Sequence, residues 1–196
     1  MNKLEHFFQR VHFMKRYLGQ PRWDTGISPP ELMTYIQAHS PGRALDLGCG
    51  SGTNLVTLAE HGWQVAGIDY VPKAIRLARR RLVRLKLKQA VRLGDAAKLQ
   101  AFDRPFDLVL DIGCFHSLSD AEKLAYQKNL DVYLKPGGDY LLYAHLKEAP
   151  DAAHGIWEGD LMAFSRFLDE KWRVESSENK PDGNRPAIWV QFNKPN

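Results

Sequence analysis

A turn with three glycines in five residues constrains the fold of this chain more than any other feature. Residues 48–52 read Gly-Cys-Gly-Ser-Gly, between an expected strand over 43–46 and an expected helix over 54–61. Because glycine has no side chain, a ligand can press on the backbone there, and the following helix points its N-terminus at the same place. In an open α/β sheet, ligands lie beyond the carboxyl ends of the strands. The turn therefore predicts an α/β sheet with a ligand at this edge.

Apolar periodicity switches repeatedly between strand-like and helical patterns, which predicts alternating strands and helices. Strands are expected over 43–46, 64–69, 91–94, 106–112, 139–146, 171–178 and 187–193. Helices are expected over 4–18, 29–38, 54–61, 72–87, 119–134 and 158–170, with Ser28 and Ser119 as N-caps. Crossover connections make such a sheet mainly parallel, and the last two strands, joined only by a loop, predict an antiparallel hairpin. The expected fold is a single α/β domain with a Rossmann-like, doubly wound, seven-stranded sheet.

Length and composition fit one globular domain, with 196 residues, 44% hydrophobic and 26% charged. No apolar run approaches the roughly 18 residues that span a bilayer, so no membrane partner is expected. Charges every few residues at the N-terminus argue against a secretory signal and make the cytoplasm the expected location. The two cysteines, Cys49 and Cys114, belong to no metal-ligand spacing, and no metal is expected.

The net charge of +4 comes from one segment. Residues 71–92 carry nine lysines and arginines and no acid, and subtracting these nine charges leaves −5 for the rest of the chain. Arg76, Arg80 and Arg84 recur four residues apart and form a ridge on the expected helix. The ridge could bind RNA or simply face water. Because no aromatic residue is interleaved for base stacking, a solvated face is favoured and a nucleic-acid partner is not expected.

Acids near the turn indicate a cationic ligand. Asp46 lies two residues before the first glycine, where it would repel a pyrophosphate but attract an ammonium and a sulfonium. S-adenosylmethionine (SAM) carries both cations. Thr53 stands where a dinucleotide-binding G-x-G-x-x-G turn has its third glycine, which disfavours NAD. Asp69 ends the second expected strand, where it could accept from both ribose hydroxyls or, alternatively, cap the helix that begins at Pro72.

Five segments occur in an order that carries a family resemblance. They are residues 44–54 (Ala-Leu-Asp-Leu-Gly-Cys-Gly-Ser-Gly-Thr-Asn), 67–70 (Gly-Ile-Asp-Tyr), 94–96 (Gly-Asp-Ala), 106–111 (Phe-Asp-Leu-Val-Leu-Asp) and 134–138 (Leu-Lys-Pro-Gly-Gly). Together they resemble the ordered motifs of class I SAM-dependent methyltransferases, over roughly residues 20–194. The resemblance implies an enzyme that uses SAM and releases S-adenosylhomocysteine (SAH).

The resemblance also implies which residues hold the cofactor. Around the methionine part it implies Asp46, Gly48, the backbone near Cys49, and Gly50, with Thr53 and Asn54 at the start of the next helix. Around the adenosine part it implies Asp69 at the ribose, Tyr70 and Asp95 at the adenine, and the backbone N–H of Ala96 at a ring nitrogen. At the transfer site it implies Asp111 and Ile112.

Two further segments resemble small thiopurine and tellurite-resistance methyltransferases. They are residues 23–32 (Trp-Asp-Thr-Gly-Ile-Ser-Pro-Pro-Glu-Leu) and 113–118 (Gly-Cys-Phe-His-Ser-Leu). In such enzymes the N-terminal segment closes over the cofactor, so residues 1–40 are expected to form a helical lid on a core of residues 41–196. The lid would bring Trp23 near the sulfonium, where an indole face attracts a cation. A tryptophan packed in the core is the alternative.

The methyl acceptor is less constrained. His116 is the best-placed base or acceptor-orienting residue, and Phe115, His145 and Trp157 are expected around the acceptor. The Asp/Asn-Pro-Pro-Tyr/Phe motif of amino-methylating nucleic-acid enzymes is absent, and 196 residues hold no appended recognition domain. We therefore expect a small acceptor: a thiol, a selenol, a halide or an aromatic oxygen or nitrogen nucleophile. RNA or protein methylation through helix 72–88 and non-catalytic SAM binding are the alternatives, and a monomer or homodimer is expected.

Overall fold

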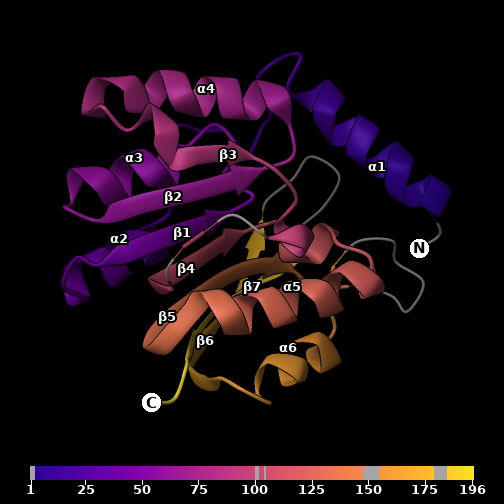
Figure 1. Cartoon of the computed structure of the whole chain (residues 1–196). Coiled ribbons are helices and arrows are strands. Elements are labelled where there is room, and N and C mark those ends of the chain that lie inside the picture. Colours follow the sequence, from indigo (N-terminus) through magenta and orange to yellow (C-terminus); the bar gives the residue numbers. More distant parts are fainter. Residues whose placement is uncertain (1–2, 100–101, 104, 148–154, 179–184) are drawn as a thin grey trace.

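One sheet lies between layers of helices in the computed structural model of the chain, and a further helix extends across one edge (Figure 1). The structure describes residues 3–99, 102–103, 105–147, 155–178 and 185–196. Among these residues no helix is both long and apolar enough to cross a membrane.

The described residues form a seven-stranded sheet with the order β3-β2-β1-β4-β5-β7-β6. The strands are β1 Arg43–Leu47, β2 Gln64–Asp69, β3 Val91–Leu93, β4 Phe106–Ile112, β5 Leu134–His145, β6 Asp169–Glu178 and β7 Arg185–Asn193. Strands β1 to β5 pair in parallel, and β7 is antiparallel to both β5 and β6. The predicted α/β class, mainly parallel sheet and C-terminal antiparallel hairpin are confirmed. The strand order reverses between β1 and β4, so the glycine turn lies where such sheets bind ligands.

Helices cover both faces of this sheet. They are α1 Lys3–Arg16, α2 Pro30–Ala38, α3 Thr53–Glu60, α4 Pro72–Leu82, α5 Asp120–Tyr133 and α6 Glu158–Phe164, with short 3-10 helices η1 Val83–Leu85, η2 Lys88–Ala90, η3 Ala96–Lys98 and η4 Phe115–Ser117. Successive strand residues face opposite sides. Thus Leu45 packs in the core with α5 and α6, whereas Ala44 packs with α2 and α3. Burial on both sides holds the strand ends, and the turns after them, in place.

The ends of two helices differ from the expectation. Helix α4 ends at Leu82 and not near residue 87, because the chain turns through Lys86, whose φ of +59° is incompatible with a helix. Helix α6 ends at Phe164 and not at residue 170, and β6 begins already at Asp169. Strand β5 begins at Leu134, five residues before the expected start. The early start of β5 reflects strand pairing, because Leu134 pairs with Phe106 of β4.

The two predicted N-caps have different outcomes. Ser119 and Glu122 form the predicted capping box of α5. Ser28, in contrast, is not the cap of α2, because Pro29 holds that position. The Ser28 hydroxyl instead lies 2.9 Å from Oδ1 of Asn54 and 2.8 Å from Oγ1 of Thr57, so it ties the N-terminal segment to α3.

Candidate cofactor site

Glycine is required in the turn between β1 and α3. Gly48, Gly50 and Gly52 have φ angles of +76°, +54° and +81°, a region that favours glycine. A Cβ on Gly48 would lie 2.8 Å from the Cβ of Cys114, and a Cβ on Gly52 would lie 2.9 Å from the Cβ of Ala78. The turn therefore packs directly on the loop after β4 and on α4, and a larger residue would displace one of them.

The carboxylate of Asp69 ties the end of β2 to the glycine turn. It accepts hydrogen bonds from the backbone N–H of Gly50, at 2.9 Å, and of Val71, at 2.7 Å. Burial raises the pKa of Asp69 to about 6, although both hydrogen bonds favour the charged form. The N-cap of α4 is Val71, and no side chain caps that helix. The alternative interpretation of Asp69 as the cap of this helix is therefore wrong.

Asp46 is a buried carboxylate with an unmet hydrogen bond. The residue is 1% exposed, and its Oδ2 atom has no hydrogen-bond partner among the described residues. Burial and the charges of Asp111 and Asp69 raise the pKa of Asp46 well above its ordinary value. A buried polar atom left unpaired costs about 1–3 kcal/mol. A cationic donor at Oδ2 would remove both this penalty and the charge repulsion, so Asp46 fits the ammonium group of SAM.

Asp111 holds the loop that follows β4. Its carboxylate accepts from the backbone N–H of Cys114 at 2.8 Å, from that of Phe115 at 3.0 Å, and from the Tyr126 hydroxyl at 2.6 Å. Burial nevertheless raises the pKa of Asp111 to about 7. Ile112, the next residue, packs with the core cluster that contains α2. Asp111 thus shapes the predicted transfer site from within the protein, and a contact of either residue with the cofactor stays a prediction.

Arg10 of α1 is bound to the residues predicted to hold the adenine. Its guanidinium forms an ion pair with Asp95 and lies 3.5 Å from a carboxylate oxygen of Glu122. It also lies 4.9 Å from the centre of the Tyr70 ring, a distance suited to cation–π attraction. Ala96, beside Asp95, is almost completely buried at the start of η3. The structure therefore brings Tyr70 and Asp95 together around Arg10.

The segment after α1 covers the glycine turn. Tyr17 is buried, and its hydroxyl lies so close to Gly50 that a Cβ on that glycine would be 2.8 Å from it. The ring of Trp23 packs edge-on against Phe13, at 5.7 Å, and Tyr17, at 6.3 Å, between ring centres. Trp23 is 51% exposed, so its alternative interpretation as a core residue is wrong. Its predicted contact with the sulfonium stays a prediction.

His116 and His145 lie together at the carboxyl ends of β4 and β5. Their ring centres are 4.7 Å apart, and the backbone N–H of His145 donates to Nδ1 of His116 at 3.1 Å. A neutral His116 ring therefore carries its proton on Nε2 and acts there as a donor. This geometry favours the acceptor-orienting role of His116 over the role of general base.

The other two predicted acceptor residues have opposite exposures. Phe115 is fully buried against Tyr126 and Phe164, so its ring faces the core in this conformation. Trp157 is 41% exposed, and the ammonium of Lys147 lies 5.7 Å from the centre of its ring. Of the two, Trp157 offers a surface to a ligand.

Three cations at the site were missed by sequence reasoning: Arg10, Arg81 and Lys123. The Lys123 ammonium is buried and lies 2.8 Å from a carboxylate oxygen of Asp160, which fixes the start of α6 to α5. A signal for Lys123 exists, because it shares one face of α5 with buried Tyr126 and Leu130 at positions i, i+3 and i+7. No comparable local signal marks Arg10. Arg81 follows buried Ala74 and Ala78 at positions i, i+4 and i+7, but that spacing does not indicate which residues it contacts.

Comparison with known proteins identifies the family. A methyltransferase-domain model matches residues 44–138, which hold the glycine turn, Asp69 and Asp111. An uncharacterized methyltransferase of Schizosaccharomyces pombe is 31% identical over 115 residues, covering 59% of this chain and 79% of that protein. The chain belongs to the class I SAM-dependent methyltransferases.

Two further relatives resemble this methyltransferase over most of its length. The 2-heptyl-1-hydroxyquinolin-4(1H)-one methyltransferase of Mycobacteroides abscessus is 28% identical over 163 residues, covering 80% of this chain and 70% of that protein. The solved structure of Burkholderia thailandensis 1,6-didemethyltoxoflavin-N1-methyltransferase, with that compound and SAH bound, superposes with a TM-score of 0.73. It is 21% identical, covering 100% of this chain and 92% of that chain, and the likeness shows the fold.

We predict that the affinity of the methyltransferase for SAH depends on pH through the predicted contact of Asp69 with the ribose. Ribose hydroxyls donate to an ionised carboxylate, and the raised pKa of about 6 means that the neutral acid dominates below pH 6. Affinity should therefore fall about tenfold between pH 7 and pH 5. Calorimetric titration with SAH at several pH values measures this directly.

The Asp69→Asn variant is the control for this prediction. It removes the charge-assisted hydrogen bonds, so at pH 7.5 SAH binding should weaken by about 1.5–3 kcal/mol. Its affinity should also lose the Asp69-dependent fall below pH 6. A wild-type affinity that stays constant from pH 5 to pH 7.5 would contradict the assignment of Asp69 to the ribose.

Proposed function

We propose that this methyltransferase transfers the methyl group of SAM to a small-molecule acceptor: a thiol, a selenol, a halide or an aromatic oxygen or nitrogen nucleophile. The observation that carries the cofactor part is the buried Oδ2 of Asp46 beside the glycine turn, which has no hydrogen-bond partner among the residues that the structure describes. A small acceptor is supported by the two relatives above, a 2-heptyl-1-hydroxyquinolin-4(1H)-one methyltransferase and a 1,6-didemethyltoxoflavin-N1-methyltransferase.

In this proposal Asp46 and Asp69 bind different parts of the cofactor. Asp46 accepts from the ammonium group, the backbone around Gly48 and Gly50 lies along the methionine part, and Asp69 accepts from the ribose. SAM, when bound, supplies an electrophilic methyl group. The chain then has to align the acceptor with that methyl and exclude water, because methyl transfer is an in-line displacement.

Acceptor binding is proposed at the loops that follow β4 and β5. His116 donates from Nε2 to orient the acceptor, in line with its hydrogen bond from His145. Trp157, the residue just before α6, contributes an exposed aromatic face. An orienting donor without a base suits acceptors that attack as anions or as neutral soft nucleophiles.

The N-terminal residues 1–40 are proposed to act as a lid on the core. The contacts of α1 support this role. Arg10 forms an ion pair with Asp95 and lies over the ring of Tyr70, and both residues are assigned to the adenine. Adenine and Arg10 compete for the same groups, so the cofactor enters when Arg10 withdraws. Such competition lowers the apparent affinity for the cofactor.

Removing the competing group should strengthen cofactor binding. Arg10→Met keeps the aliphatic stem but deletes a partly buried ion pair worth about 1 kcal/mol, so the Kd for SAH should fall about fivefold. Lys15→Met is the matched control, since Lys15 lies exposed on the same helix, and it should leave the Kd unchanged. A weaker affinity in Arg10→Met would mean that Arg10 binds the cofactor instead of competing with it.

The orienting role of His116 predicts a pattern of kinetic changes. His116→Gln keeps a side-chain donor and should retain kcat within about threefold. His116→Leu removes the donor and should raise KM for the acceptor about tenfold, by the loss of one hydrogen bond. A general base would instead show a loss of 10²–10⁴ in kcat, together with loss of the acidic limb of the pH profile, in both variants.

Two measurements test the proposed function as a whole. Calorimetric titration with SAM, SAH and NAD should show binding of the first two only, and binding of NAD without SAM would overturn the proposal. Incubation with labelled SAM and a panel of thiols, selenols, halides, phenols and amines should identify the acceptor class. SAM binding with no methylation across this panel would contradict the proposed small-molecule transfer.

A further inference from the structure

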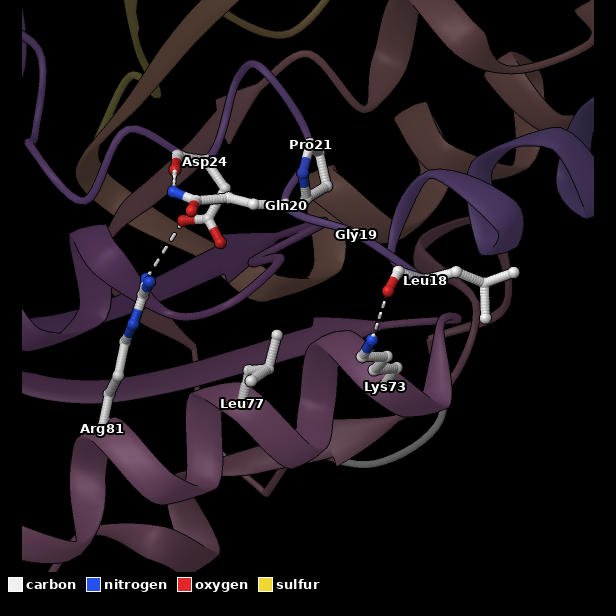
Figure 2. Close-up of a pocket in the computed structure, with 8 residues that line it drawn as sticks. All are labelled: Leu18, Gly19, Gln20, Pro21, Asp24, Lys73, Leu77 and Arg81. Atoms are coloured by element: carbon white, nitrogen blue, oxygen red, sulfur yellow. Dashed lines mark hydrogen bonds and ion pairs between the residues drawn. The ribbon is translucent and has the colours of Figure 1, made fainter.

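A hollow of about 370 Å³ separates the segment after α1 from helix α4 (Figure 2). Its walls are Leu18, Gly19, Gln20, Pro21, Asp24, Lys73, Leu77 and Arg81. Two polar contacts bridge it, one near each end. Lys73 donates to the backbone carbonyl of Leu18 at 3.0 Å, and Arg81 lies 3.1 Å from a carboxylate oxygen of Asp24. The N-terminal segment is thus attached to α4 at two points with little packing between them.

The contact at Arg81 belongs to a larger polar cluster beside the glycine turn. Nη1 of Arg81 lies within hydrogen-bond distance of the hydroxyls of Ser51 and Thr53, as well as of Asp24. The Ser51 hydroxyl in turn donates to Asp24 at 2.6 Å. Ser51 and Asp24 are both buried, at 4% and 8% exposure. A buried carboxylate with a guanidinium and a hydroxyl as partners forms stronger hydrogen bonds than a surface ion pair.

This cluster joins three separate parts of the cofactor site. Ser51 is a residue of the glycine turn, Thr53 is the first residue of α3, and Asp24 adjoins Trp23 in the N-terminal segment. A single guanidinium from α4 therefore sets the position of the turn relative to the segment that covers it.

Helical geometry explains why Arg81 differs from its basic neighbours. Arg81 follows Ala74 and Ala78 at helical spacing, on the side of α4 that packs on the core and the turn. The close contact of Ala78 with Gly52 brings α4 near enough for Arg81 to reach Ser51. Arg80 lies on the exposed side of α4 instead, and Arg84, in the following η1, pairs with Glu60 in solvent. The basic segment therefore contains one arginine with a role distinct from a solvated face.

We infer that Arg81 is a positioning residue, which clamps the N-terminal segment to the glycine turn through Asp24 and Ser51 and thereby holds the methionine end of the cofactor site. The inference rests on the proposed function, because it assumes that SAM lies at this turn. It requires no contact between Arg81 and the cofactor. Loss of the clamp should weaken cofactor binding without changing the chemical step.

The experiment compares Arg81→Ala with Arg80→Ala, which removes the same charge from an exposed neighbouring position. Arg81→Ala should raise the Kd for SAH and the KM for SAM about tenfold, with kcat changed less than about threefold, while Arg80→Ala should match the wild type. Arg81→Lys should restore part of the affinity, because an ammonium can reach one of the three oxygens but cannot replace the planar guanidinium. Arg81→Ala combined with Asp24→Asn should be less than additive, since both remove the same contact.

A second readout does not depend on SAM. Arg22 is exposed within the clamped segment, so trypsin should cut after Arg22 at least fivefold faster in Arg81→Ala than in Arg80→Ala, with thermal unfolding monitored in parallel. An Arg81→Ala variant with wild-type SAH affinity and unchanged cleavage would overturn the inference. So would a lower melting temperature with unchanged SAH affinity and unchanged cleavage. If the wild type binds no SAH, the proposed function fails, and faster cleavage alone still supports the clamp.

Discussion

The cofactor site depends on the contact between the glycine turn and the end of β2. The backbone N–H groups of Gly48 and Cys49 both donate to the carbonyl of Ile68, at 2.9 and 3.0 Å, and the next residue, Asp69, accepts from Gly50. Three successive turn residues are thereby held by two successive strand residues. This attachment uses backbone and one carboxylate only, so it allows the turn to consist of residues without bulky side chains. The same carboxylate is then in place for a ribose.

Three buried carboxylates lie around this contact, at the ends of β1, β2 and β4. Burial raises the pKa of Asp46, Asp69 and Asp111 alike, but their hydrogen bonds differ. Asp69 accepts from backbone N–H groups of the glycine turn and of its own loop, and Asp111 accepts from its own loop, whereas one oxygen of Asp46 has no partner among the described residues. Two of the acids are therefore explained by the fold itself. Asp46, the acid just before the glycine turn, is best explained by a bound cation that pairs with its Oδ2 atom.

Local signals predict the parts of the fold that depend on neighbouring residues. The glycine turn, the alternation of strands and helices, and the Ser119 capping box all rest on residues close in sequence, and the structure confirms them. Arg10 and Arg81 could not be found in that way, because they meet partners 85 and 57 residues away, on elements whose faces the sequence does not orient. Ser28 is a further example. The local sequence predicts it as the cap of α2, but its hydroxyl instead contacts α3, a partner that the local sequence does not indicate.

The two arginines attach the N-terminal segment at two places around the proposed cofactor site. Arg10 pairs with Asp95, which is proposed to bind the adenine, and Arg81 pairs with Asp24 beside the glycine turn. These attachments differ in their partners, because Arg10 pairs with groups proposed to bind the adenine, whereas Arg81 and Ser51 pair with Asp24, to which no ligand contact is assigned. If the proposed assignments hold, α1 can open without breaking the contacts of Asp24 with Ser51 and Arg81, because those contacts involve no residue of α1. The proposal therefore favours cofactor entry from the side of α1, with the glycine turn already formed.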